Sequence, residues 1–117
     1  MSRLTTHVLD IAAGIPARNM TIELHRLDER GPELLRRVVT DADGRVAGAL
    51  LEGADLRSGR YTLTFHAADY FRARGTPQSD PPFLDQVVIG FGIADPQQHY
   101  HVPLLVSPWS YSTYRGS

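Results

Sequence analysis

The chain has 117 residues, 42% of them hydrophobic, and its 12 basic and 13 acidic side chains leave a formal net charge of -1. This length fits one domain, spanning residues 1–117, and the near-neutral charge gives no electrostatic reason to expect a nucleic acid or an anionic membrane as a partner. The absence of cysteine excludes disulfides, thiol catalysis and cysteine-based zinc sites, so any chemistry must come from His, Arg, Ser, Tyr or carboxylate side chains.

Short stretches of alternating apolar and polar residues predict strands throughout the first half of the chain. In the first of these stretches Thr6 and Val8 share one face, while Thr5 and His7 lie on the other. The Gly-Ile-Pro-Ala sequence at residues 14–17 ends that strand. The predicted strands of this half span residues 4–11, 20–27, 34–40 and 45–49.

Two further signals define connections between strands. The Asp-Gly pair within residues 41–45 predicts a turn in which Gly44 takes a positive φ, so that Arg45 begins the strand that follows. Residues 67–74 have a composition compatible with a helix, and Gly75 stands where a C-terminal cap is expected. A helix this short needs packing against the strands to be stable.

The strands of the second half also separate an apolar face from a polar one. Val102, Leu104 and Val106 alternate with polar positions that include His99 and His101. This spacing predicts one face in the core and one face that carries imidazoles. The predicted strands of this half span residues 59–66, 83–91, 100–107 and 109–114, with a Ser-Pro turn between the last two.

The last predicted strand leads directly into the end of the sequence. Ser112 and Tyr114 lie on its polar side, and Thr113 lies on the side of the core. Residues 114–117 then place a guanidinium, a hydroxyl and a terminal carboxylate beside that polar side. We expect this end to be ordered, whereas most termini fray.

Together, about eight short strands and one short helix predict a two-sheet antiparallel sandwich. The first ten residues lack a charged and then apolar leader pattern, and the chain has no run of about 18 apolar residues. We therefore expect a soluble protein of the cytoplasm that is not secreted.

Five histidines invite a metal-site interpretation. His99 and His101 are two residues apart on one strand face, and a third imidazole such as that of His7 could join them. However, no acidic residue lies near His101 in the sequence to complete such a site. Another interpretation is that these are surface histidines and that Arg45 is a solvated turn residue. Residues 114–117, the C-terminal tetrad, would then be an ordinary tail. Spacing alone does not decide between these readings.

Four segments together resemble the 5-hydroxyisourate hydrolases, the transthyretin-related enzymes of urate catabolism. Compared with the hormone carrier transthyretin, the enzyme pattern has a His in the first strand, an Arg after the turn, a His in the penultimate strand and a YRGS end. This chain has His7, Arg45, His101 and the tetrad 114–117 at those positions. The matching segments read LTTHVLDIAAGIPA at residues 4–17, TDADGR at 40–45, GRYTLTF at 59–65 and HYHVPLLVSPWSYSTYRGS at 99–117.

The resemblance implies an all-β, prealbumin-like (transthyretin-like) sandwich of two four-stranded sheets with one short helix. It also implies a homotetramer, assembled as a dimer of dimers, in which the polar face of His7, His101, Ser112 and Tyr114 lines a channel at the dimer–dimer interface. Residues 1–117 would then form a single hydrolase domain that binds neither nucleic acid nor a membrane.

The same resemblance implies hydrolysis of 5-hydroxyisourate to 2-oxo-4-hydroxy-4-carboxy-5-ureidoimidazoline, with no cofactor and no metal. The expected catalytic residues are His7, Arg45 and His101, with the two histidines as the acid–base system and the arginine as an electrostatic clamp. Which histidine is the base stays open, and His99 is a lower-ranked candidate. The expected substrate-binding residues are Ser112, Tyr114, Arg115, Gly116 and Ser117. A transthyretin-like small-ligand carrier and a His-based metal-binding module are the alternatives.

Overall fold

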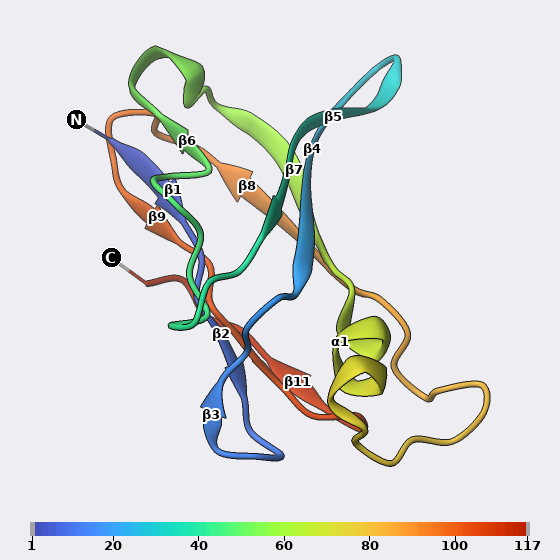
Figure 1. Cartoon of the computed structure of the whole chain (residues 1–117). Coiled ribbons are helices and arrows are strands. Elements are labelled where there is room, and N and C mark those ends of the chain that lie inside the picture. Colours follow the sequence, from blue (N-terminus) through green and yellow to red (C-terminus); the bar gives the residue numbers. More distant parts are fainter. Residues whose placement is uncertain (1, 117) are drawn as a thin grey trace.

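The computed structural model describes residues 2–116 and shows a sandwich built mostly of short strands, with one α-helix beside it (Figure 1). One layer is a four-stranded antiparallel sheet in the order β5-β4-β7-β8. Its strands are β4 (Thr21–Asp28), β5 (Gly31–Val39), β7 (Gly59–Phe65) and β8 (Val87–Ile93). Three of them match the predicted strands to within a few residues. The fourth prediction was wrong at its start, because residues 83–86 are irregular and β8 begins at Val87.

The second layer is divided into two groups of strands, β6-β1-β9 and β11-β10-β2-β3. The predicted strands at residues 4–11 and 100–107 are therefore each split in two. Pro103 lies at the second break and has no N–H to donate to a sheet. Across the breaks, the Thr6 hydroxyl donates to the Val102 carbonyl over 2.7 Å. The strands are β1 (Arg3–Thr5), β2 (Val8–Asp10), β3 (Ile15–Pro16), β6 (Leu51–Glu52), β9 (Tyr100–His101), β10 (Leu104–Val106) and β11 (Tyr111–Ser112).

Two strand pairs in this layer are parallel, β1 with β9 and β2 with β10, so the expectation of a purely antiparallel sandwich was wrong. Alternation in a sequence shows which face a residue occupies and carries no information on strand direction. The described C-terminal residues run back along β9, on the side of the molecule where β1 also lies (Figure 1).

Most residues that the sequence predicts to face the core are buried between the two layers. Val8, Val102, Leu104 and Val106 are all buried, as their alternation predicts. Thr113 was also expected on the core side, but it is exposed. Its hydroxyl instead donates to the carbonyl of Pro103 over 2.7 Å.

Residues 45–49 form a loop and not the predicted strand. The loop still contributes apolar side chains to the core, because Val46 and Ala49 are buried. The preceding turn is as predicted, with Gly44 at a φ of 75°. The turn is fixed to the second layer because the Val8 N–H donates to the Gly44 carbonyl over 2.8 Å.

Replacing Gly44 by alanine is expected to destabilise the fold more than replacing Gly48. Both glycines have left-handed φ angles, 75° and 71°, which cost an alanine roughly 1–2 kcal/mol. At Gly44 the new Cβ would also collide with the Val8 carbonyl oxygen, whereas at Gly48 it would meet nothing within 4 Å. Urea unfolding should therefore show a loss for G44A that exceeds the loss for G48A by at least about 1 kcal/mol. Equal losses of unfolding free energy in the two variants would contradict close packing of the turn against β2.

The helix α1 (Ala67–Arg74) ends at Gly75 in the left-handed conformation, as predicted. It is tied to the second layer by the buried carboxylate of Asp10, which accepts a hydrogen bond of 2.8 Å from the Tyr70 hydroxyl. Burial and this carboxylate raise the pKa of Tyr70 far above its ordinary value. A short 3-10 helix occupies Gly53–Asp55. Among residues 2–116, no helix has the length and apolar character that crossing a bilayer requires.

Candidate functional site

The parallel pairing of β1 with β9 brings the first and last parts of the chain together at His101. Thr5 is the register partner of His101, and its hydroxyl oxygen lies 2.8 Å from the Nδ1 atom of the imidazole. The His101 side chain is half-buried. One imidazole nitrogen is therefore already engaged within the protein.

His7 lies at the break between β1 and β2, on the same face as Thr5. Its backbone carbonyl accepts from the Leu104 N–H over 2.9 Å, which fixes this position beside β10. Its Nε2 atom lies 2.7 Å from the carbonyl oxygen of Asp43. Because a carbonyl can only accept, Nε2 must carry a hydrogen in both the neutral and the charged imidazole.

Arg45 reaches the same face from the turn that follows β5. Its backbone N–H donates to the Asp41 carboxylate over 3.1 Å, and its side chain is exposed. Burial, followed by the positive charges of Arg45 and His7, lowers the pKa of His101. The structure thus brings together the three residues that were predicted to be catalytic, although they are far apart in the sequence.

Gly116 packs directly against His101. Its N–H donates to the His101 carbonyl over 2.7 Å, and the two residues form an isolated antiparallel bridge. A Cβ at Gly116 would lie 2.8 Å from His101 Cδ2 and 2.9 Å from His101 Cβ. The described part of the C-terminal end therefore lies in close contact with His101.

The other predicted substrate-binding residues do not converge on His101 to the same degree. The Arg115 guanidinium donates to the Gln98 side chain over 2.9 Å and to the His99 carbonyl over 3.1 Å, and it lies 4.5 Å from the centre of the Tyr100 ring. The side chain of His99 is exposed, and only its backbone carbonyl contacts Arg115 among these residues. Ser112 and Tyr114 are exposed, and Ser117 lies outside the described residues.

Sequence reasoning missed two partners of the histidines, Thr5 and the Asp43 carbonyl. Thr5 could have been found, because it shares a strand face with His7 two residues away. The parallel register that places it beside His101 could not be found from alternation. A backbone carbonyl leaves no signal in a sequence at all.

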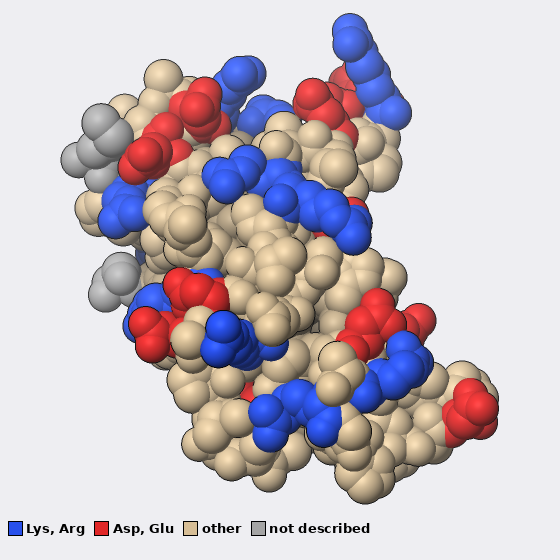
Figure 2. All heavy atoms as spheres, viewed as in Figure 1, with Lys and Arg blue, Asp and Glu red and all other residues tan. Residues whose placement is uncertain are grey.

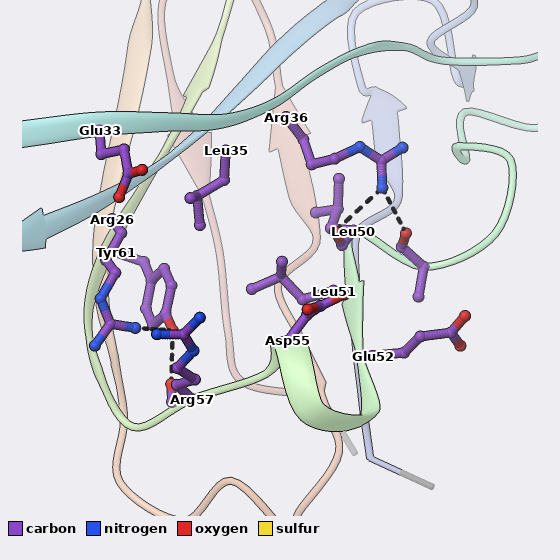
Figure 3. A pocket seen from close by; sticks show the side chains of 11 residues that line it. Arg26, Glu33, Leu35, Arg36, Leu50, Leu51, Glu52, Asp55, Arg57 and Tyr61 are labelled. Carbon is purple, nitrogen blue, oxygen red and sulfur yellow. Dashed lines mark hydrogen bonds between the residues drawn. The ribbon is translucent and has the colours of Figure 1, made fainter.

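A separate pocket of about 400 Å³ lies between β5 and residues 49–57 (Figure 3). None of the predicted site residues lines it. Its Arg26 donates to the Tyr61 hydroxyl over 2.8 Å, and its Arg36 donates to the carbonyls of Ala49 and Leu50. Both guanidinium groups therefore hold the fold together.

The surface outside the candidate site carries charged groups of both signs. Figure 2 shows both acidic and basic side chains distributed over the face in view. Within residues 2–116, no three His, Cys, Asp or Glu side chains come together as a group that could hold a metal ion.

Comparison with known proteins places this geometry in a family. The family model described as HIUase/Transthyretin family matches residues 4–116. The chain belongs to this family. The 5-hydroxyisourate hydrolase 2 of Rhizobium meliloti (strain 1021) is 57% identical over 115 residues, which cover 98% of this chain and 96% of the relative.

Two solved structures define the fold. The crystal structure of (S)-allantoin synthase has a TM-score of 0.95 and 50% identity, and the match covers 99% of this chain but only 44% of the synthase chain. Sea bream transthyretin in complex with thyroxine has a TM-score of 0.85 at 27% identity, covering 97% of this chain and 94% of that chain. The predicted prealbumin-like sandwich with one short helix is therefore confirmed, with the division of its second layer as an added feature.

Proposed function

We propose that this protein is an enzyme that hydrolyses 5-hydroxyisourate to 2-oxo-4-hydroxy-4-carboxy-5-ureidoimidazoline in urate catabolism, as a single domain of residues 1–117. The observation that carries the proposal is the 57% identity to a 5-hydroxyisourate hydrolase, supported by a fold in which the segments of His7, Arg45 and His101 lie side by side. The relative that binds thyroxine, sea bream transthyretin, is only 27% identical.

The reaction adds water across the ring amide between N1 and C6. A base takes a proton from water as its oxygen bonds to C6, and negative charge develops on the C6 oxygen. The N1–C6 bond then breaks, and N1 takes up a proton. Two imidazoles can exchange these protons near neutral pH, and the Arg45 guanidinium can stabilise the oxyanion.

Substrate is proposed to be held by Ser112, Tyr114, Arg115, Gly116 and Ser117. In a single chain Arg45 and Tyr114, which are expected to face the substrate beside His101, are exposed. We therefore propose that a homotetramer, built as a dimer of dimers, closes this face into a channel. Water would be activated by histidine, with no metal and no cofactor.

The test follows the decay of freshly made 5-hydroxyisourate through the loss of its ultraviolet absorbance. Protein stripped with a chelator is expected to speed this decay well above the rate in buffer. No acceleration would contradict the proposal and leave the carrier alternative, which thyroxine binding would then examine. Activity that disappears on chelation and returns with a metal ion would favour the metal-binding alternative.

Replacing Gly116 by alanine is expected to lower the hydrolysis rate by roughly 10-fold or more while changing stability little. The added Cβ would press on the ring and the Cβ of His101, so the imidazole or the C-terminal segment must move; misplacing a catalytic group by about 1 Å can cost about 100-fold. Gly90→Ala on β8 is the matched control, because a Cβ there meets nothing within 4 Å. Equal rates for the two variants would rule out a catalytic need for this contact.

A further inference from the structure

We infer that Thr5 is a positioning residue that holds the neutral His101 imidazole in the tautomer with Nε2 unprotonated, so that His101 is the general base and His7 the proton donor. This assignment rests on the proposed hydrolysis. It concerns which atom of each ring handles a proton.

The surroundings of His101 leave one ring nitrogen for a ligand. The Thr5 hydroxyl lies 2.8 Å from Nδ1. On the opposite edge of the ring, Gly116 is close enough that a Cβ there would be 2.8 Å from Cδ2. With these two edges covered, Nε2 is the nitrogen that remains to meet water or substrate.

The direction of the Thr5 hydrogen bond follows from the charges around the ring. A hydroxyl can donate or accept, so geometry alone allows both tautomers. Arg45 from the turn after β5 and His7 from the adjacent break are the positive groups that act on His101. Because Thr5 occupies Nδ1, we place the lone pair that these positive charges favour at Nε2. Nδ1 then carries the hydrogen and donates it to the Thr5 oxygen.

The same positive groups, together with burial, lower the pKa of His101. The ring is therefore neutral at neutral pH, as a base must be. On the C-terminal side, the guanidinium of Arg115 is directed to Gln98 and to the His99 carbonyl.

His7 has the complementary arrangement. Its Nε2–H donates to the Asp43 carbonyl over 2.7 Å, so Nδ1 is the nitrogen left to exchange a proton. As a proton donor, His7 therefore acts through Nδ1. In the reaction, His101 Nε2 takes the proton from water and His7 Nδ1 gives a proton to N1 as the N1–C6 bond breaks. Exchange with solvent afterwards returns each ring to its starting state.

The kinetic test uses Thr5→Val, Thr5→Ser and, as a matched control, Thr62→Val on β7 of the other sheet. T5V is expected to lower kcat roughly 10-fold, because a partner that orients a functional histidine typically contributes about 10- to 100-fold. T5S retains the hydroxyl and should restore most of the wild-type kcat. T62V should match the wild type. Wild-type kcat in T5V, or a loss that T5S does not recover, would overturn the inference.

The pH profile separates a positioning role from a structural one. A general base works when it is unprotonated, so kcat/KM falls as pH drops through its pKa, which lies below the ordinary value of about 6.5. The backbone of Thr5 raises the pKa of His101 and is retained in T5V; the Thr5 hydroxyl also favours the imidazolium, because it accepts from Nδ1–H. Its removal in T5V should therefore move the acid limb to still lower pH. An unchanged limb would contradict the assignment.

Nitrogen-15 NMR of the full chain tests the tautomers without relying on activity. We expect His101 protonated at Nδ1 and His7 protonated at Nε2 in their neutral forms. The opposite tautomer at His101 would overturn the inference, whatever the activities of the variants. If the wild type did not hydrolyse 5-hydroxyisourate, the proposed function would fail, and the tautomers of His101 in the wild type and in T5V would still decide the role of Thr5.

Discussion

Replacing His101 by alanine is expected to lower kcat for 5-hydroxyisourate by at least about 100-fold, the usual contribution of a general base. The ring is half-buried and its removal leaves the apolar core intact, so the unfolding temperature should stay close to the wild-type value. The loss should appear in kcat and kcat/KM alike, since the base acts on water and not on binding. His7→Ala and Arg45→Ala should each have effects of similar size.

His25→Ala provides the matched control for these variants. His25 is also a half-buried histidine on a strand, but it lies on β4 in the other sheet. Its removal should leave the rate unchanged. If one of the three site variants kept full activity, the role assigned to that residue would be wrong; if H25A lost as much as H101A, the losses would reflect general damage to the fold.

Local patterns in the sequence were enough to predict most elements of the fold. The helix Ala67–Arg74 and its Gly75 cap were predicted with their observed bounds, because composition and capping act within one turn of chain. The turn at Gly44 was predicted for the same reason. The strand predicted at residues 45–49 fails because Val46 and Ala49 reach the core from a loop, and burial overrides the local pattern.

The candidate site was predicted from the sequence less completely. Resemblance to a family supplied His7, Arg45 and His101, and their chain segments lie together because Thr5 pairs with His101 and His7 contacts the Asp43 carbonyl in the turn before Arg45. The parallel register of β1 and β9 depends on contacts between residues nearly a full chain length apart, which no local pattern encodes. Thr5 was therefore visible as a neighbour of His7 in sequence but not as a partner of His101.

Deleting residues 115–117 is expected to abolish most of the hydrolysis while leaving the unfolding temperature nearly unchanged. The deletion removes the Gly116 bridge to His101 and the contacts of Arg115 with Gln98 and Tyr100. None of the described residues after Pro108 is buried, so the truncated chain keeps its core. Hydrolysis rates and thermal unfolding, measured on the same samples, test the two halves of this expectation.

A tag fused after Ser117 should have the same effect as the deletion, because it adds chain beside the face that carries His101. Arg115→Ala separates the parts of the segment, since it removes the guanidinium contacts but retains the Gly116 bridge; its activity should fall between the wild type and the truncation. Size-exclusion chromatography checks that the assembly is unchanged. A truncated protein that retains activity, or that loses stability in proportion to activity, would show that residues 115–117 serve packing. A segment that holds substrate and contacts His101 must instead affect activity without affecting stability.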